Sequence, residues 1–185
     1  FMDVMLTFAS KVSNNRLLSC IRDAFTDLMP VIIIGSFCTL FSNVVCNTTP
    51  GYMSLANVPG FAWLGMFKPL FVAANYGTMN MMAIGIVILL SAKVAESYGN
   101  KDKVVSILAL SCFISLCVTS ATAVAAESGE AVTINNVLAS NYTNAQGLFV
   151  AMLVAVVSAT LYVKIVNSGK LKISMPDSVP PNIAR

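Results

Sequence analysis

Residues 28–45 read LMPVIIIGSFCTLFSNVV, and this run without a charged side chain decides the fold. A helix needs about 20 predominantly apolar residues to cross a bilayer, so the run is long enough for one crossing. Pro30 lies in the first turn, where the missing backbone N–H costs a helix little. The stretch therefore predicts a transmembrane helix.

The whole chain has the composition of a membrane protein. Of its 185 residues 57% are hydrophobic and 10% are charged, whereas soluble domains carry about 25% charged residues. The sequence contains no histidine, which excludes an imidazole proton shuttle or a histidine metal ligand within it. Its five cysteines lack the spacing of a metal site or a disulfide framework. We therefore expect no metal, no cofactor and no nucleic-acid partner.

Three more apolar stretches follow the first, and each is close to the length of one crossing. They lie between Lys68 and Lys93, at residues 104–126 and at residues 145–163. Residues 1–27 alternate apolar and charged positions at helical spacing, which is typical of an amphipathic helix at a membrane surface. The predicted fold is all-α and polytopic, with a surface helix at 1–27 and a scaffold of four transmembrane helices within 28–173.

The basic residues predict how the chain is oriented. If the first span runs outward, all but one of the 11 lysines and arginines lie inside, and Lys68 alone lies outside. By the positive-inside rule this arrangement places both termini in the cytoplasm. Trp63 and Tyr142 then fall in the outer loops, where amphipathic rings settle at the membrane interface.

Small residues recur four apart in the third and fourth spans. Such stripes let helix backbones approach closely inside a membrane. They indicate either the interface of a homodimer or packing within one chain, and the spacing does not distinguish the two. The stripe of the third span is Ser111, Ser115, Thr119 and Ala123, and that of the fourth is Gly147, Ala151, Ala155 and Ala159.

The second span carries a polar cluster, NYGTMN, at residues 75–80. Amides are costly inside a bilayer unless they find partners, so Asn75 and Asn80 should face protein or a water-filled cavity. They could line a path for a sugar or an ion, or they could bond neighbouring helices. The sequence shows no nucleophile with a base, no phosphate-binding loop and no carboxylate pair, so we assign no catalytic residue.

Three stretches resemble a known family: NNRLLSCIRDAFTDLMPVIIIGSF at 14–37, AKVAESYGNKDK at 92–103 and GKLKISMPDSVPPNIAR at 169–185. They look like the amino-terminal part of enzyme IIC, the membrane permease of the bacterial sugar phosphotransferase system, and in particular its lactose/cellobiose/diacetylchitobiose branch. The resemblance implies a multi-pass protein of the bacterial inner membrane. It also implies uptake of a disaccharide, which a cytoplasmic partner, enzyme IIB, phosphorylates, and amino-terminal helices that build the scaffold and the homodimer interface.

Members of that family are considerably longer than this sequence. The resemblance implies that their carboxy-terminal helices hold the sugar with a histidine and a glutamate, and no position here matches those residues. Residues 174–185 resemble the cytoplasmic linker that leads to the sugar-binding domain. We therefore expect a truncated scaffold that does not transport alone, with Asn75 and Asn80 as candidates for the wall that faces the missing domain.

Two other interpretations remain open at this point. The chain could be a complete small membrane protein that acts by assembling with a full permease. It could also be a small four-helix channel with its path along the NYGTMN face. The resemblance leaves open which sugar the parent protein carries, because the selecting residues of the family lie outside the part that this sequence matches.

Overall fold

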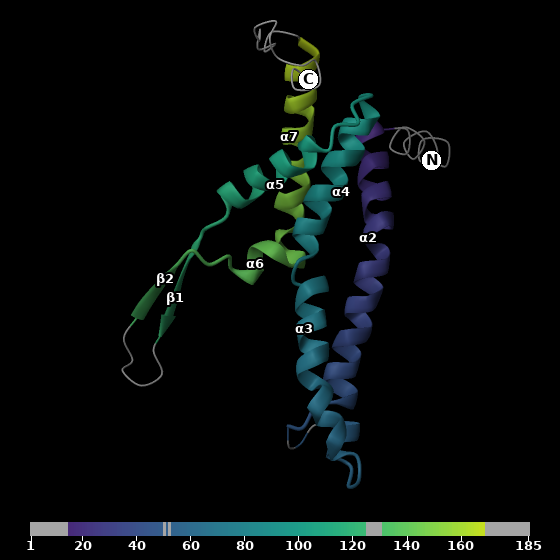
Figure 1. Cartoon of the computed structure of the whole chain (residues 1–185), viewed down its shortest axis with the longest axis vertical. Helices are drawn as coiled ribbons and strands as arrows, with labels where there is room; N and C mark the ends of the chain where they lie inside the picture. Colours follow the sequence, from purple (N-terminus) through teal and green to yellow (C-terminus); the bar gives the residue numbers. More distant parts are fainter. Residues whose placement is uncertain (1–14, 50, 52, 125–130, 169–185) are drawn as a thin grey trace, which may run out of the picture.

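The computed structural model describes residues 15–49, 51, 53–124 and 131–168 (Figure 1). The fold is dominated by helices, and three segments are long and apolar enough to cross a membrane: Arg16–Val45, Ala62–Ser97 and Ala145–Ser168. Val104–Leu116 is a shorter apolar helix. The predicted all-α membrane protein is thereby confirmed, with three long helical segments and one short one in place of four equal spans.

The elements follow one another in a simple order. The helices are α2 (Arg16–Leu40), α3 (Lys68–Thr78), α4 (Met82–Ser97), α5 (Val104–Leu116), α6 (Ser140–Thr143) and α7 (Leu148–Ser168). Short turns of π or 3₁₀ helix are η1 (Phe41–Val45), η2 (Leu55–Asn57), η3 (Ala62–Phe67) and η4 (Ala145–Gly147). Strands β1 (Ser120–Val124) and β2 (Ala131–Asn135) pair antiparallel in a hairpin.

Helix α2 continues without a break through the predicted boundary at residue 27, so Pro30 lies inside the helix and not in its first turn as predicted. Asn15 caps it, since its side-chain oxygen accepts the backbone N–H of Leu17 at 3.0 Å. Cys20, Ala24 and Leu28 lie four apart and are buried in the core that α2 shares with α4. The apolar face that we predicted to lie on the membrane surface is thus partly covered by protein. Residues 1–14 of that surface helix, and the predicted linker 174–185, lie outside the described residues.

The predicted third span, residues 104–126, is wrong in its extent. Helix α5 ends at Leu116, and Cys117 is already extended with ψ of 143°. The β-branched residues that follow favour a strand, and Thr122 pairs with Thr133 across the hairpin. Thr119 and Ala123 therefore do not continue the helical stripe, and only Ser111 and Ser115 lie on the helix.

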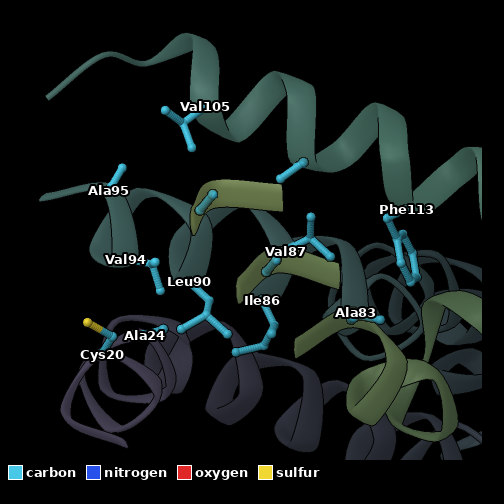
Figure 2. Packing of buried hydrophobic residues seen from close by; sticks show 14 of the residues in the cluster. Cys20, Ala24, Ala83, Ile86, Val87, Leu90, Val94, Ala95, Val105 and Phe113 are labelled. Carbon is cyan, nitrogen blue, oxygen red and sulfur yellow. The ribbon is translucent and has the colours of Figure 1, made fainter. Parts of the chain in front are cut away.

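One half of the molecule is a bundle of four helices, which we call the four-helix half: residues 16–28 of α2 with α4, α5 and α7. Helix α4 packs against the other three. Figure 2 shows the side chains of α4 pointing into this core from a central position. The buried residues of α4 are Met82, Ala83, Ile86, Val87, Leu90, Ser91, Val94 and Ala95.

Polar contacts close the four-helix half at the end where α2 begins and α4 ends. The Nζ atom of Lys93 lies 2.9 Å from a carboxylate oxygen of Asp27, which joins α4 to α2. The guanidinium of Arg16 lies 5.1 Å from the ring centre of Tyr98, a cation–π distance. These contacts fix the amino-terminal turns of α2 to the end of α4.

The remaining half consists of residues 35–45 of the first span beside α3, and we call it the two-helix half. In Figure 1, α3 runs along the lower part of α2, and the rings of Phe41 and Phe71 stack at 5.3 Å between centres. No residue of α3 is buried. Large apolar side chains of the first span are also exposed here, among them Phe37, Leu40 and Val44.

Candidate functional site

The second span is interrupted at its midpoint. Helix α3 ends at Thr78 and α4 begins at Met82, so residues 79–81 form a turn near the middle of the apolar segment Ala62–Ser97. No side chain caps the start of α4. An interrupted helix at membrane depth is tolerated only where protein or a water-filled cavity covers it, and such breaks form binding sites in many transporters.

Asn75 joins the end of α3 to α2. Its side-chain N–H group donates to the carbonyl oxygen of Gly35 at 3.4 Å and to the hydroxyl of Thr39. The hydroxyl of Thr39 in turn donates to the carbonyl of Gly35 at 2.9 Å. Asn75 therefore bonds a neighbouring helix, which is one of the two roles that the sequence left open for it.

Gly35 permits the close approach of the two helices at the break. A Cβ atom at this position would lie 2.6 Å from both the Cγ of Met79 and the hydroxyl oxygen of Thr78. The sequence analysis missed Gly35 and Thr39 as partners of the polar cluster. The signal was available, because a glycine after three isoleucines stands four residues before a threonine, on the same helix face.

The opposite side of the break carries Tyr76, Gly77 and Asn80, which we call the open face. Tyr76 is 49% exposed and Asn80 is half-buried. A Cβ atom added to Gly77 would meet nothing within 4 Å. In the part of the chain that the structure describes, the side chains of Tyr76 and Asn80 form no hydrogen bond. The open face therefore offers an amide and a phenol without internal partners.

The small residues of the fourth span lie inside the chain's own core. Ala151, Ala155 and Ala159 are fully buried, and Gly147 is buried at the turn before α7. A Cβ atom at Gly147 would collide with the backbone carbonyl of Tyr142. The structure thus places the three alanines in the core that includes α4, and Gly147 against the backbone of α6.

Ser111 and Ser115 are exposed on α5, away from the core. Each hydroxyl donates to the carbonyl four residues earlier in the helix, at 3.0 and 2.8 Å respectively. Neither side chain therefore bonds another helix of this chain. The two predicted stripes have different environments, since one is packed inside the molecule and the other is presented outward.

A groove of about 290 Å³ lies between α5 and α7, but its chemistry does not suit a sugar. Its lining is Cys112, Leu116, Leu153, Val154, Val157, Ser158 and Leu161. The hydroxyl of Ser158 already donates to the carbonyl of Val154 at 2.6 Å. Sugar sites need several convergent polar groups. Among the described residues there is also no group of three or more His, Cys, Asp or Glu that could hold a metal.

Comparison with known proteins gives a consistent result over nearly the whole chain. A family model described as "Phosphotransferase system, EIIC" matches residues 22–185. The oligo-beta-mannoside-specific EIIC component of Bacillus subtilis (strain 168) is 29% identical over 98% of this chain and 38% of that protein. The cellobiose-specific EIIC component of Geobacillus stearothermophilus is 30% identical over 99% of this chain and 39% of that protein.

A solved structure has the same arrangement of helices. The crystal structure of the transporter ChbC, the IIC component from the N,N'-diacetylchitobiose-specific phosphotransferase system, superimposes with a TM-score of 0.74 at 28% identity. The match covers 97% of this chain and 40% of that one. The chain thus spans about two fifths of the length of the relatives that it matches.

Proposed function

The chain belongs to the phosphotransferase system EIIC family, and on that premise we propose that it is the scaffold of a disaccharide permease. Three of its relatives supply the substrate class, since their names specify cellobiose, lactose and diacetylchitobiose, while another is named for oligo-beta-mannosides. We assign sugar binding and phosphorylation to the part of the permease that lies outside the region matched by this chain. The scaffold itself provides a membrane-spanning body against which that part packs.

The open face of the helix break is the observation that carries this proposal. An unsatisfied polar group in hydrocarbon costs several kcal/mol, so the amide of Asn80 needs a partner from outside the described residues. Among the described residues, helix α3 packs mainly against α2 and the short turns η1 and η3 beside it. If the rest of the permease packs against the open face, it can bond the amide of Asn80 and at the same time cover the exposed side chains of the two-helix half.

We further propose that both termini face the cytoplasm and that enzyme IIB approaches from that side. The basic residues at the ends of the helices support this orientation, because Arg16, Lys93 and Lys164 lie toward the same end of the bundle (Figure 1). Lys68 starts α3 at the opposite end. This asymmetry follows the positive-inside rule.

The proposed homodimer would use the outward side of α5. Ser111 and Ser115 are exposed there and allow close approach of a second helix. Ala151 and Ala155 are buried in the chain's own core, so cysteines at those positions would not report on a dimer. We expect disulfide cross-links between copies that carry cysteine at Ser111 or Ser115, and their absence at both positions would argue against this dimer.

Cellobiose uptake tests the scaffold proposal. The chain is expressed alone, and also fused after Arg185 to the remaining part of the Geobacillus stearothermophilus cellobiose EIIC component. The host lacks its own cellobiose EIIC component and retains enzyme IIB. We expect uptake with the fusion and none with the chain alone. Uptake by the chain alone would refute the proposal, as would a fusion that inserts normally in the membrane and takes up nothing.

Two variants of the fusion separate the roles of the asparagines. Asn80→Leu should lower cellobiose uptake at a normal protein level, because it removes the amide that faces the other half. Asn75→Leu should instead lower the amount of folded protein, because it breaks the bonds to Gly35 and Thr39. Normal uptake by Asn80→Leu would show that the open face does not receive the sugar-binding part.

A further inference from the structure

Lys68, the first residue of α3, is held by a buried amide at the end of the two-helix half. Its Nζ atom donates to the side-chain oxygen of Asn47 at 2.9 Å. Asn47 is only 6% exposed. The same oxygen accepts the backbone N–H of Thr49 at 3.2 Å and its hydroxyl at 2.9 Å, while the hydroxyl of Ser54 donates to the Asn47 carbonyl. These bonds fix the amide and, through it, the ammonium group.

The charge of Lys68 has no anionic partner among the described residues. The ion pairs found there are Arg22 with Asp23 and Lys93 with Asp27, both in the four-helix half. The sequence from residue 42 to 67 contains no charged side chain. An ammonium group has three donors, and the bond to Asn47 uses one of them. The site therefore presents a fixed, uncompensated positive charge with free donors.

Large apolar side chains are exposed in η3, the turn that directly precedes Lys68. In η3, Trp63 is 60% exposed and Met66 is 84% exposed, and the rings of Trp63 and Phe67 meet edge to face at 6.0 Å. A Cβ atom at Gly65 would lie 2.5 Å from the methyl group of Thr48, so η3 packs closely on the loop that holds Lys68. The exposed apolar side chains of η3 and the ammonium of Lys68 are thus both anchored to residues 47–48 at this end of the two-helix half.

The position along the span matches the level of lipid headgroups. Lys68 precedes Asn80 by a distance of about 18 Å along a helix, from a rise of about 1.5 Å per residue. The hydrocarbon core of a bilayer is about 30 Å thick, so half of it is about 15 Å. With the helix break at mid-depth, the ammonium of Lys68 reaches the phosphate layer.

We propose that Lys68, positioned by Asn47, binds the phosphate of an anionic phospholipid whose acyl chains lie against Trp63 and Met66. The uncompensated positive charge favours an anionic ligand. The exposed apolar side chains of η3 favour a ligand with hydrocarbon chains. A free phosphate ion would leave those side chains uncovered. The site is independent of the open face and of the proposed role in sugar uptake.

Trp63 makes the test direct because it is the only tryptophan in the chain. The full chain is reconstituted in vesicles of equal parts phosphatidylcholine and phosphatidylglycerol, with bromine on the acyl chains of one lipid or the other. Bromine quenches tryptophan fluorescence on contact. We expect about fivefold preferred association of phosphatidylglycerol near Trp63, the factor expected for one lysine at a membrane surface.

Variants assign the preference to Lys68. Lys68→Gln should remove it and Lys68→Arg should keep it. Lys101→Gln should leave it unchanged, because Lys101 lies beyond the end of α4, at the opposite end of the second span. Asn47→Ala keeps the charge but frees the ammonium, and should reduce the preference. Far-UV circular dichroism confirms that each variant retains its helices.

Several results would overturn the proposal. Equal quenching by the two brominated lipids in the unmodified chain would show that no anionic lipid is selected. A preference that survives in a folded Lys68→Gln would assign it to another residue, and an unchanged preference in Asn47→Ala would show that the amide does not build the site. A preference abolished by millimolar inorganic phosphate would identify a free anion as the occupant.

Discussion

The two helices of the second span are both rich in apolar residues, yet their environments differ completely. In α4 eight residues are buried, whereas in α3 none is. Leu90 is fully buried and Leu70 is 63% exposed. Inside a bilayer, lipid is as apolar as leucine, so hydrophobicity does not decide which helix face meets protein. The difference arises because α4 packs against three helices and α3 mainly against one.

The largest expected difference between the halves is in the free energy of unfolding that is lost when a glycine is replaced by alanine. Gly147→Ala drives a Cβ atom into the backbone of Tyr142 and should lower the free energy of unfolding by about 4 kcal/mol, above the typical cost of overpacking because backbone atoms cannot move aside as a flexible side chain can. Gly77→Ala meets open space and should change it by no more than about 1 kcal/mol. Unfolding in mixed detergent micelles, followed by circular dichroism, compares the two. Equal losses would remove the distinction between the halves.

A matched pair of leucines tests packing without backbone collisions. Leu90→Ala leaves a cavity in the core of the four-helix half and should lower the free energy of unfolding by about 3 kcal/mol. Leu70→Ala, on the exposed side of α3, should cost less than about 0.5 kcal/mol. The same micelle unfolding measurement applies. A large cost at Leu70 would mean that α3 is covered in the isolated chain, for instance by a second copy.

At the junction between the halves, Gly35→Ala should lower the free energy of unfolding by an amount between those of the core and the exposed substitutions. The new Cβ atom would press on Met79 and Thr78, and a flexible methionine can yield, so we expect a cost of about 1–2 kcal/mol. Ser36→Ala is the control on the neighbouring exposed position, and it should be close to neutral. A neutral Gly35→Ala would contradict the close approach of α2 to the helix break.

The smallest effect is expected at the ion pair that closes the four-helix half. Asp27→Asn breaks the contact with Lys93, but the two side chains are 45% and 34% exposed. Partly exposed pairs contribute about 0.5 kcal/mol or less, and salt should reduce that further. Unfolding at low and high salt measures the difference. A loss of several kcal/mol would show that the pair is a main support of the α2–α4 contact.

The sequence was sufficient for the fold class, and its polar residues 75–80 lie where the structure interrupts the second span. Uncharged runs near membrane length and the distribution of lysines are signals that do not depend on tertiary contacts. The helix break was not predictable, because residues 79–81 contain neither proline nor glycine. The early end of α5 was missed for a related reason, since an apolar run of β-branched and small residues suits a membrane helix and a hairpin equally.

The environment of each small residue depends on which helix faces pack against one another. The spacing of small residues along the sequence does not contain this information. Gly147 and Ser111 belong to stripes with the same four-residue period. One is packed against the backbone of Tyr142 and the other points outward on α5. Periodicity identifies a face that permits close approach, but only the structure shows whether a neighbour occupies it.

The most direct test of the scaffold account is the lipid exposure of Tyr76. A spin label is attached to Tyr76→Cys after the five native cysteines are changed to alanine, and its accessibility to dissolved oxygen is measured in the chain alone and in the uptake-competent fusion. A label at Phe149→Cys, which is 68% exposed on α7 and lies outside both the open face and the proposed dimer face of α5, serves as the reference. The account predicts that oxygen accessibility falls at Tyr76 upon fusion and stays constant at Phe149. Unchanged accessibility at Tyr76 would contradict it.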